Sequence, residues 1–271
     1  MQKITMALTA GLLLTAGAAQ AEDSHSAGLD GFVAVSVGQG ELREFQGNST
    51  TRNEGVASEA QLSLAYTDSS GFGGQFDYVS FDQRMGQRNT NIRSSEQLVH
   101  LFYRNEQGLL GLFTQHRRSR YEGALVGTTD FVGAEAELYL GRATVAAKGG
   151  EATWDYWGRR EHGYFAGTQL RYFPDDNLRL ELTADYQNDQ ARQRWQQKTY
   201  GAGVEHRLSD SRWSVSARYE FVREEWGPIA EQNRVLLGVK YHFGKDTLLQ
   251  QDRSGASLRP VARVLYWGGV S

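Results

Sequence analysis

The chain has 271 residues, with 29 lysines and arginines against 32 aspartates and glutamates, and it has no cysteine. The mildly acidic balance argues against a nucleic-acid partner, which requires a basic face, and the missing cysteines exclude a fold closed by disulfides. A composition of 31 glycines, 13 tyrosines, 12 phenylalanines and only 3 prolines favours many paired strands over helices.

The first residues have the pattern of an export signal. Lys3 precedes an apolar run over 6–18, and Ala19 and Ala21 place small residues at the two positions that a signal peptidase reads. We therefore expect residues 1–21 to be removed and residues 22–29 to form a short N-terminal segment. No later stretch approaches the roughly 18 consecutive apolar residues of a membrane-spanning helix.

Apolar and polar residues alternate with a period of two through the region 30–243. The segment 178–186 is the clearest case, since Leu178, Leu180 and Leu182 share one face while charged residues occupy the other. The same alternation recurs in 213–221 and 235–243, and twelve such segments can be counted. Most of them are about 10–13 residues long, which is enough for a tilted strand to cross a bilayer.

Short and long connections follow one another in strict alternation. Turn-forming residues gather at the short connections 68–71, 105–108, 140–142, 174–177 and 209–212. Longer polar links are expected at 45–55, 83–94, 117–129, 155–162, 188–195 and 225–232. Outer-membrane barrels have short periplasmic turns and longer extracellular loops, and lipid leaves no strand edge unpaired. We therefore predict an all-β fold, a closed antiparallel transmembrane β-barrel of about 12 strands over residues 30–243.

Aromatic residues near the connections predict two interfacial girdles, although aromatics also simply favour strands. The predicted periplasmic girdle consists of Tyr66, Phe72, Tyr103, Tyr139, Tyr172, Trp213 and Phe243. The predicted outer girdle consists of Trp154, Tyr156, Trp157, Tyr186, Trp195 and Trp226.

The segment 235–243 resembles the last strand of the Gram-negative outer-membrane β-barrel (porin-like) superfamily, which ends in alternating apolar residues and a phenylalanine. The resemblance implies that Tyr241 and Phe243 belong to an assembly signal. It also implies that the barrel-assembly machinery and periplasmic chaperones are partners, and that the protein resides among outer-membrane lipid and lipopolysaccharide. Phe243 is not terminal, because residues 244–271 follow as a periplasmic or lumen-inserted tail. Alternatively 261–267 forms another strand, which leaves the count open between twelve and fourteen.

If the apolar faces meet lipid, the charged residues opposite them line the lumen. The predicted pore-lining residues are Glu59, Asp77, Glu135, Glu137, Arg171, Arg179, Glu181, Asp185, Lys198, Arg218, Glu220, Arg234 and Lys240. Acidic residues dominate the first half and basic residues the second, and opposed walls of this kind favour small polar or zwitterionic solutes. We expect a porin-like channel for passive diffusion of small hydrophilic solutes, without enzymatic activity or a cofactor. A non-conducting barrel, structural or adhesive, whose charges pair with one another is the alternative.

A barrel enzyme acting on envelope lipid is a further alternative. It needs a nucleophile, a base and an orienting group within hydrogen-bond reach. His116 with Ser119, and His162 near Glu161, are the nearest candidates, but neither pair lies in a catalytic motif.

Candidate sites for metal ions or phosphate groups have weaker support in the sequence. No two histidines have metal-ligand spacing, and Asp175-Asp176 is first of all part of a turn. Arg118 and Arg120, together with Arg117, are candidate contacts for lipopolysaccharide phosphates. The pair 159–160 is a similar candidate, against the default of exposed loop charge.

Overall fold

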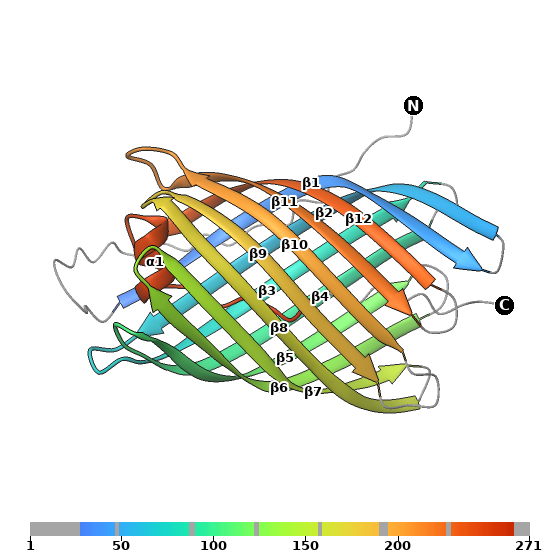
Figure 1. Cartoon of the computed structure of the whole chain (residues 1–271), viewed down its shortest axis with the longest axis horizontal. Coiled ribbons are helices and arrows are strands. Elements are labelled where there is room, and N and C mark those ends of the chain that lie inside the picture. The colour runs from blue at the N-terminus through green and yellow to red at the C-terminus, as the bar shows by residue number, and fades with distance from the viewer. Residues whose placement is uncertain are drawn as a thin grey trace.

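The computed structural model describes residues 28–46, 49–86, 90–121, 125–156, 159–189, 195–225 and 229–262. Twelve antiparallel strands close into a barrel in which β12 pairs with β1 (Figure 1), which confirms the predicted fold and strand number. The first six strands are β1 (Gly28–Gln46), β2 (Ser49–Thr67), β3 (Phe72–Met85), β4 (Thr90–Arg104), β5 (Gly108–Tyr121) and β6 (Leu125–Leu140). The others are β7 (Ala143–Tyr156), β8 (Arg159–Asp175), β9 (Leu178–Asp189), β10 (Gln196–Arg207), β11 (Trp213–Glu225) and β12 (Ile229–Phe243).

The alternation in the sequence becomes an apolar exterior and a polar interior. Leu101 and Leu112, which are paired across β4 and β5, are 68% and 67% exposed on the outside. Gln115 and Arg117, which alternate with the outward residues of β5, are 0% and 1% exposed. Such a broad apolar exterior is unfavourable in water and suits the hydrocarbon of a bilayer. No helix within the described ranges is long and apolar enough to cross a membrane.

The barrel closes through an unbroken ladder. The register of β1 with β12 runs from Gly31 opposite Phe243 to Phe45 opposite Ile229. All strand pairing is therefore complete before Gly244, and both ends of the barrel wall lie on the same side. Tyr241 and Phe243 lie in β12 with outward-facing positions, and Tyr241 packs edge-on against Trp213 at 5.0 Å between ring centroids.

The short connections are tight turns, and they define what we call the short-turn end of the barrel. Asp68 shows how they are made: its Oδ1 accepts hydrogen bonds from Ser70 Oγ, at 2.6 Å, and from the backbone N–H groups of Ser70 and Phe72. The hydrogen bond from the Ser70 side chain lowers the pKa of Asp68.

The opposite end, which we call the long-hairpin end, differs from the prediction. Most residues of the expected loops continue the strands, so that β5 runs to Tyr121 and β6 begins at Leu125. Strand pairing likewise continues through the expected loop 45–55. Arg52, which lies inside that range, pairs with Arg43, which lies just before it. Polar residues on both faces hide the alternation there, while backbone pairing continues.

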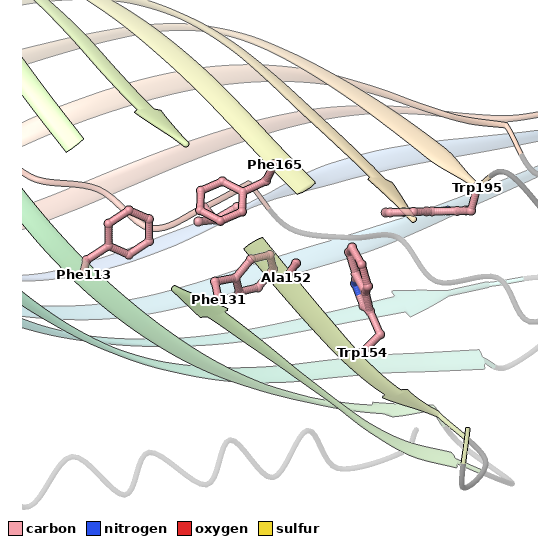
Figure 2. Close-up of a cluster of buried hydrophobic side chains, with 7 residues drawn as sticks. Phe113, Phe131, Ala152, Trp154, Phe165 and Trp195 are labelled. Carbon is pink, nitrogen blue, oxygen red and sulfur yellow. The ribbon is translucent and has the colours of Figure 1, made fainter. Parts of the chain in front are cut away.

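Three predicted girdle residues lie inside the barrel instead. Trp154 and Trp195 pack against each other in the lumen, with ring centroids 5.7 Å apart, beside a cluster of buried aromatic side chains (Figure 2). Tyr139 also faces inward and donates a hydrogen bond to Glu137 at 3.1 Å. The girdle prediction was wrong for these three because nearness to a strand end does not determine which face a residue occupies. The side chains of Tyr156, Trp157 and Trp226 lie outside the described part of the chain, as does the predicted signal peptide, residues 1–21.

After β12 the chain turns into the barrel. Gly244 has a φ of 103°, a conformation that favours glycine, and helix α1 (Leu248–Ser254) follows at the short-turn end (Figure 1). Thr247 caps the helix by accepting a hydrogen bond from Gln250 N. Beyond α1 the chain runs without regular structure along the inner wall to Ala262, so 261–262 form no strand. We call residues 244–262 the plug segment.

Candidate functional site: the barrel lumen

All but one of the predicted pore-lining residues point to the inside of the barrel. The inward-facing residues are Glu59, Asp77, Glu135, Glu137, Arg171, Arg179, Glu181, Asp185, Arg218, Glu220, Arg234 and Lys240. Lys198 points outward, because its neighbours Gln197 and Thr199 are the buried residues of β10 and its register partner is the exposed Tyr186. The prediction for Lys198 was wrong, since the pattern around 196–200 is polar on both faces.

Ion pairs bridge one side of the lumen between β11 and β2. Arg218 lies 2.9 Å from Glu59 and 2.9 Å from Glu220. The intervening inward positions on β1 and β12 at this level are the small residues Ser36 and Gly238, which leave room for the arginine. Arg234 completes the group with a 2.7 Å contact to Glu220. The acidic and basic walls expected from the sequence are therefore joined by direct ion pairs.

A second cluster centres on Glu205, which the sequence analysis had not singled out. Its carboxylate lies 2.7 Å from Arg179 and 2.8 Å from Lys240, and it accepts a hydrogen bond from Ser214 Oγ at 2.6 Å. His242 lies 3.2 Å from the same carboxylate. The alternation of β10 was the available signal, since Glu205 lies between outward-facing Val204 and His206.

On the opposite wall a buried histidine links two carboxylates. His100 has no exposed side-chain surface, and it lies 2.7 Å from Glu135 and 3.2 Å from Asp77. Gln75 donates to both oxygens of Asp77, at 3.0 and 2.9 Å. Sequence reasoning found the two acids but not the histidine that joins them, because His100 lies outside any recognisable motif.

The plug segment is bonded to the wall from its first residues. Asp30, at the start of β1, accepts hydrogen bonds from the backbone N–H groups of Lys245 at 2.9 Å and Ala256 at 2.7 Å. Asp252 in α1 lies 2.6 Å from Arg171, which also pairs with Glu137. Buried charges of this kind are tolerated only when paired, so these contacts hold α1 across the short-turn end.

The extended half of the plug segment continues along the wall. Gln75 donates to the carbonyl of Leu258 at 2.9 Å and accepts from its N–H at 3.2 Å. Arg117 donates to the carbonyl of Val261 at 2.8 Å. Arg259 pairs with Asp185 at 2.9 Å. Backbone and side chains of the plug segment are thus bound by residues of β3, β5 and β9.

The plug segment divides the lumen and leaves a cavity of about 170 Å³ beside it. One side of this cavity is the plug residues 256–262, and the other carries the charged residues of β9, β11 and β12. The charged lining residues are Glu59, Glu96, Arg179, Glu181, Asp185, Arg218, Glu220, Arg234, Lys240 and Arg259. A space of this size holds several water molecules and is strongly polar.

The residues considered for an enzyme do not come together in one catalytic site. His116 is exposed on the outer face of β5 and pairs with Asp130 at 2.7 Å, whereas Ser119 occupies an inward-facing position. His162 faces outward and lies 3.1 Å from Thr153 Oγ, and Glu161 takes the opposite face. Strand geometry separates both pairs, because adjacent and odd-spaced residues point to opposite faces.

The described part of the chain contains no group of histidine and acidic side chains arranged to hold a metal ion. Asp175 accepts a hydrogen bond from Asn177 N at 2.8 Å, and Asp176 pairs with Arg142 at 2.9 Å. Both acids thus belong to the turn between β8 and β9.

No protein-family model matches the sequence, and no curated protein matches it either. Solved outer-membrane proteins share its fold. The translocator domain of the autotransporter NalP from Neisseria meningitidis is 16% identical, with a TM-score of 0.55 over 82% of this chain and 90% of that chain. An outer membrane channel from Pseudomonas putida F1 is 14% identical, with a TM-score of 0.55 over 83% of this chain and 100% of that chain. At such identities the likeness concerns the fold alone.

Proposed function

We propose that this chain, which has the fold of outer-membrane β-barrel proteins, is a porin-like channel of the Gram-negative outer membrane. Small hydrophilic solutes diffuse passively through the polar space beside the plug segment. The observation that carries the proposal is the cavity of about 170 Å³, which is lined by charges of both signs along a closed barrel. Polar side chains that replace part of a solute's hydration are what a diffusion pore requires.

The plug segment sets the size of what can pass. Residues 256–262 form one wall of the cavity, so the free cross-section is smaller than that of the barrel itself. Paired charges such as Arg218–Glu59 and Arg234–Glu220 leave little net field. The proposed solutes are therefore small, polar and neutral or zwitterionic.

Conductance of the refolded protein in planar bilayers tests the proposal. We expect small ohmic steps from the full chain. A chain ending at Phe243 should give larger steps, because the strand ladder is complete at that residue. Absence of conductance from both proteins, in preparations that show a folded barrel, would contradict a channel.

Ion selectivity provides a second readout. Arg218→Ala leaves Glu59 and Glu220 without one of their cationic partners, so the cavity becomes more negative. The reversal potential in a salt gradient should then shift toward cation selectivity. Lys198→Ala removes the same charge from the outer face and should leave the reversal potential unchanged.

A non-conducting structural barrel is the second candidate. The observation that favours it is the number of bonds between the plug segment and the wall, including Asp252–Arg171 and Arg259–Asp185. A silent full chain together with a conducting chain that ends at Phe243 would favour this candidate.

A further inference from the structure

Four arginines gather on the outer face of three neighbouring strands at the long-hairpin end. They are Arg84 on β3, Arg93 on β4, and Arg118 and Arg120 on β5, and we call them the arginine patch. The register places Arg93 directly opposite Arg120, and Arg118 opposite Ser95. Side chains two residues apart on a strand lie on the same face, about 7 Å from each other.

The patch has an excess of positive charge. Asp82 is the carboxylate that pairs with it, at 2.8 Å from Arg93 and 3.6 Å from Arg84. Arg118 and Arg120 are exposed, and within the described residues no hydrogen bond or ion pair joins either of them to another residue.

The neighbouring strands do not neutralise these two arginines. Thr128 is the register partner of Arg118 on β6. The acid that follows on the outer face of β6 is Asp130, and it is already paired with His116 at 2.7 Å.

The patch lies at the height where a bilayer's headgroups begin. The apolar belt on β4 begins at Tyr103, and on β5 it begins at Leu110, both exposed on the outside. Arg93 precedes Tyr103 by ten residues and Arg120 follows Leu110 by ten residues, so both lie the same distance toward the long-hairpin end. At about 3.3 Å per residue and a tilt of about 40°, ten residues rise roughly 25 Å, which is the thickness of the apolar band of an outer-membrane barrel.

We propose that the arginine patch binds the phosphate groups of lipopolysaccharide, the phosphorylated glycolipid of the outer leaflet. Guanidinium groups match phosphate oxygens with paired hydrogen bonds. The acyl chains of the same molecule lie against the apolar belt below, where Val99 and Leu112 are exposed. Binding of one lipid thus satisfies the unpaired arginines and covers the strands beneath them.

Binding of lipid A to the full chain in detergent, measured by native mass spectrometry or lipid competition, tests the proposal. Wild type should prefer bisphosphorylated over dephosphorylated lipid A. The double variant R118Q/R120Q should bind the phosphorylated form about tenfold more weakly, because it loses two charge-assisted contacts. Its binding of the dephosphorylated form should not change.

The matched control is R142Q/R212Q, which removes two arginines from turns at the opposite end and should bind like wild type. R118K/R120K retains the charges and should keep most of the preference even where the glutamine variant folds poorly. The shift of the folded band on heating before electrophoresis verifies the barrel of each variant.

Three results would overturn the proposal. The first is equal binding of phosphorylated and dephosphorylated lipid A by wild type. The second is unchanged binding by the folded R118Q/R120Q protein. The third is displacement of lipid A by inorganic phosphate at equal concentration, which would indicate a site for free anions rather than for a lipid.

Discussion

Arg171 has no exposed side-chain surface, and two carboxylates, those of Glu137 and Asp252, surround its guanidinium. Thr144 adds a 2.6 Å hydrogen bond to Asp252, and Arg171 donates to the carbonyl of Ser257 at 2.9 Å. One arginine therefore joins the wall, the helix and the extended part of the plug segment. Removing one member of such a group leaves the others charged and buried.

Arg171→Met should therefore destabilise the protein by about 3–5 kcal/mol, because it removes the buried cation that two buried carboxylates share. The free energy of unfolding in lipid vesicles, from a urea titration, measures the effect. Arg160→Met, at an exposed outward position of β8, should change that free energy by no more than about 0.5 kcal/mol. A loss below about 1 kcal/mol for Arg171→Met would contradict the buried ion group.

Each strand has one face that suits the hydrocarbon of a bilayer and one face that suits the barrel interior. In β1 the outward residues Val33, Val35 and Val37 are 47%, 57% and 60% exposed, whereas the inward Phe32 is 7% exposed. A soluble protein could not expose such a row on neighbouring strands without aggregating. The register therefore has one acceptable solution in a bilayer, since a shift of one residue would exchange the two faces.

Val35→Arg should cost about 2–4 kcal/mol of unfolding free energy, because Val35 lies near the middle of the apolar belt. Gln39→Arg on the same face of the same strand lies near the interface and should cost only about 0–1 kcal/mol. The comparison uses unfolding in lipid vesicles. Equal costs at the two positions would indicate that the outer face does not contact hydrocarbon.

The end of β12 carries the predicted assembly signal. Phe243 faces outward at the last position of the strand ladder, opposite Gly31. Phe243→Ala should lower the yield of folded barrel in the outer membrane, measured from heat-modifiable protein in membrane fractions. Phe221→Ala, on the outer face of β11, removes the same ring elsewhere and should have the smaller effect. A larger loss of yield from Phe221→Ala than from Phe243→Ala would show that Phe243 is not part of the assembly signal.

The whole molecule combines a closed wall with a segment of its own chain inside. The plug segment contacts the wall at both of its halves, through Asp30 and Arg171 near α1 and through Arg117 and Asp185 beyond it. The wall makes these contacts with side chains, so their loss would leave the backbone hydrogen bonds of the strand ladder in place. In the proposed channel, the size of the opening thus depends on the stability of the plug segment rather than on that of the barrel.

Asp30→Ala should loosen the plug segment, since the carboxylate accepts backbone hydrogen bonds from Lys245 and Ala256. Hydrogen bonds to charged groups contribute about 1.5–3 kcal/mol each, so cleavage by trypsin after Arg253, which precedes Ser254, should accelerate at least about tenfold. Mass spectrometry of the fragments measures the rate. Asp176→Ala, in an exposed turn, is the control. Unchanged cleavage in a folded Asp30→Ala protein would show that other contacts hold the segment.

The sequence was enough to predict the closed barrel of twelve strands, because a period of two and the alternation of short and long connections are local features. It also determined which face most charged residues occupy, and the resemblance of 235–243 is confirmed at the level of the fold. It misplaced Lys198, where both faces carry similar residues, and it misplaced Tyr139, Trp154 and Trp195, where nearness to a strand end was the only guide.

What fills the lumen could not be predicted without the folded barrel. Glu205, His100 and Asp252 gain their importance from partners on distant strands or in the plug segment. The path of 257–262 has no periodic signal, because an extended chain inside a polar lumen is held by hydrogen bonds to its backbone, as at Leu258 and Val261. Periodicity records which solvent each face of a strand meets, whereas contacts across the lumen depend on the closure of the whole barrel.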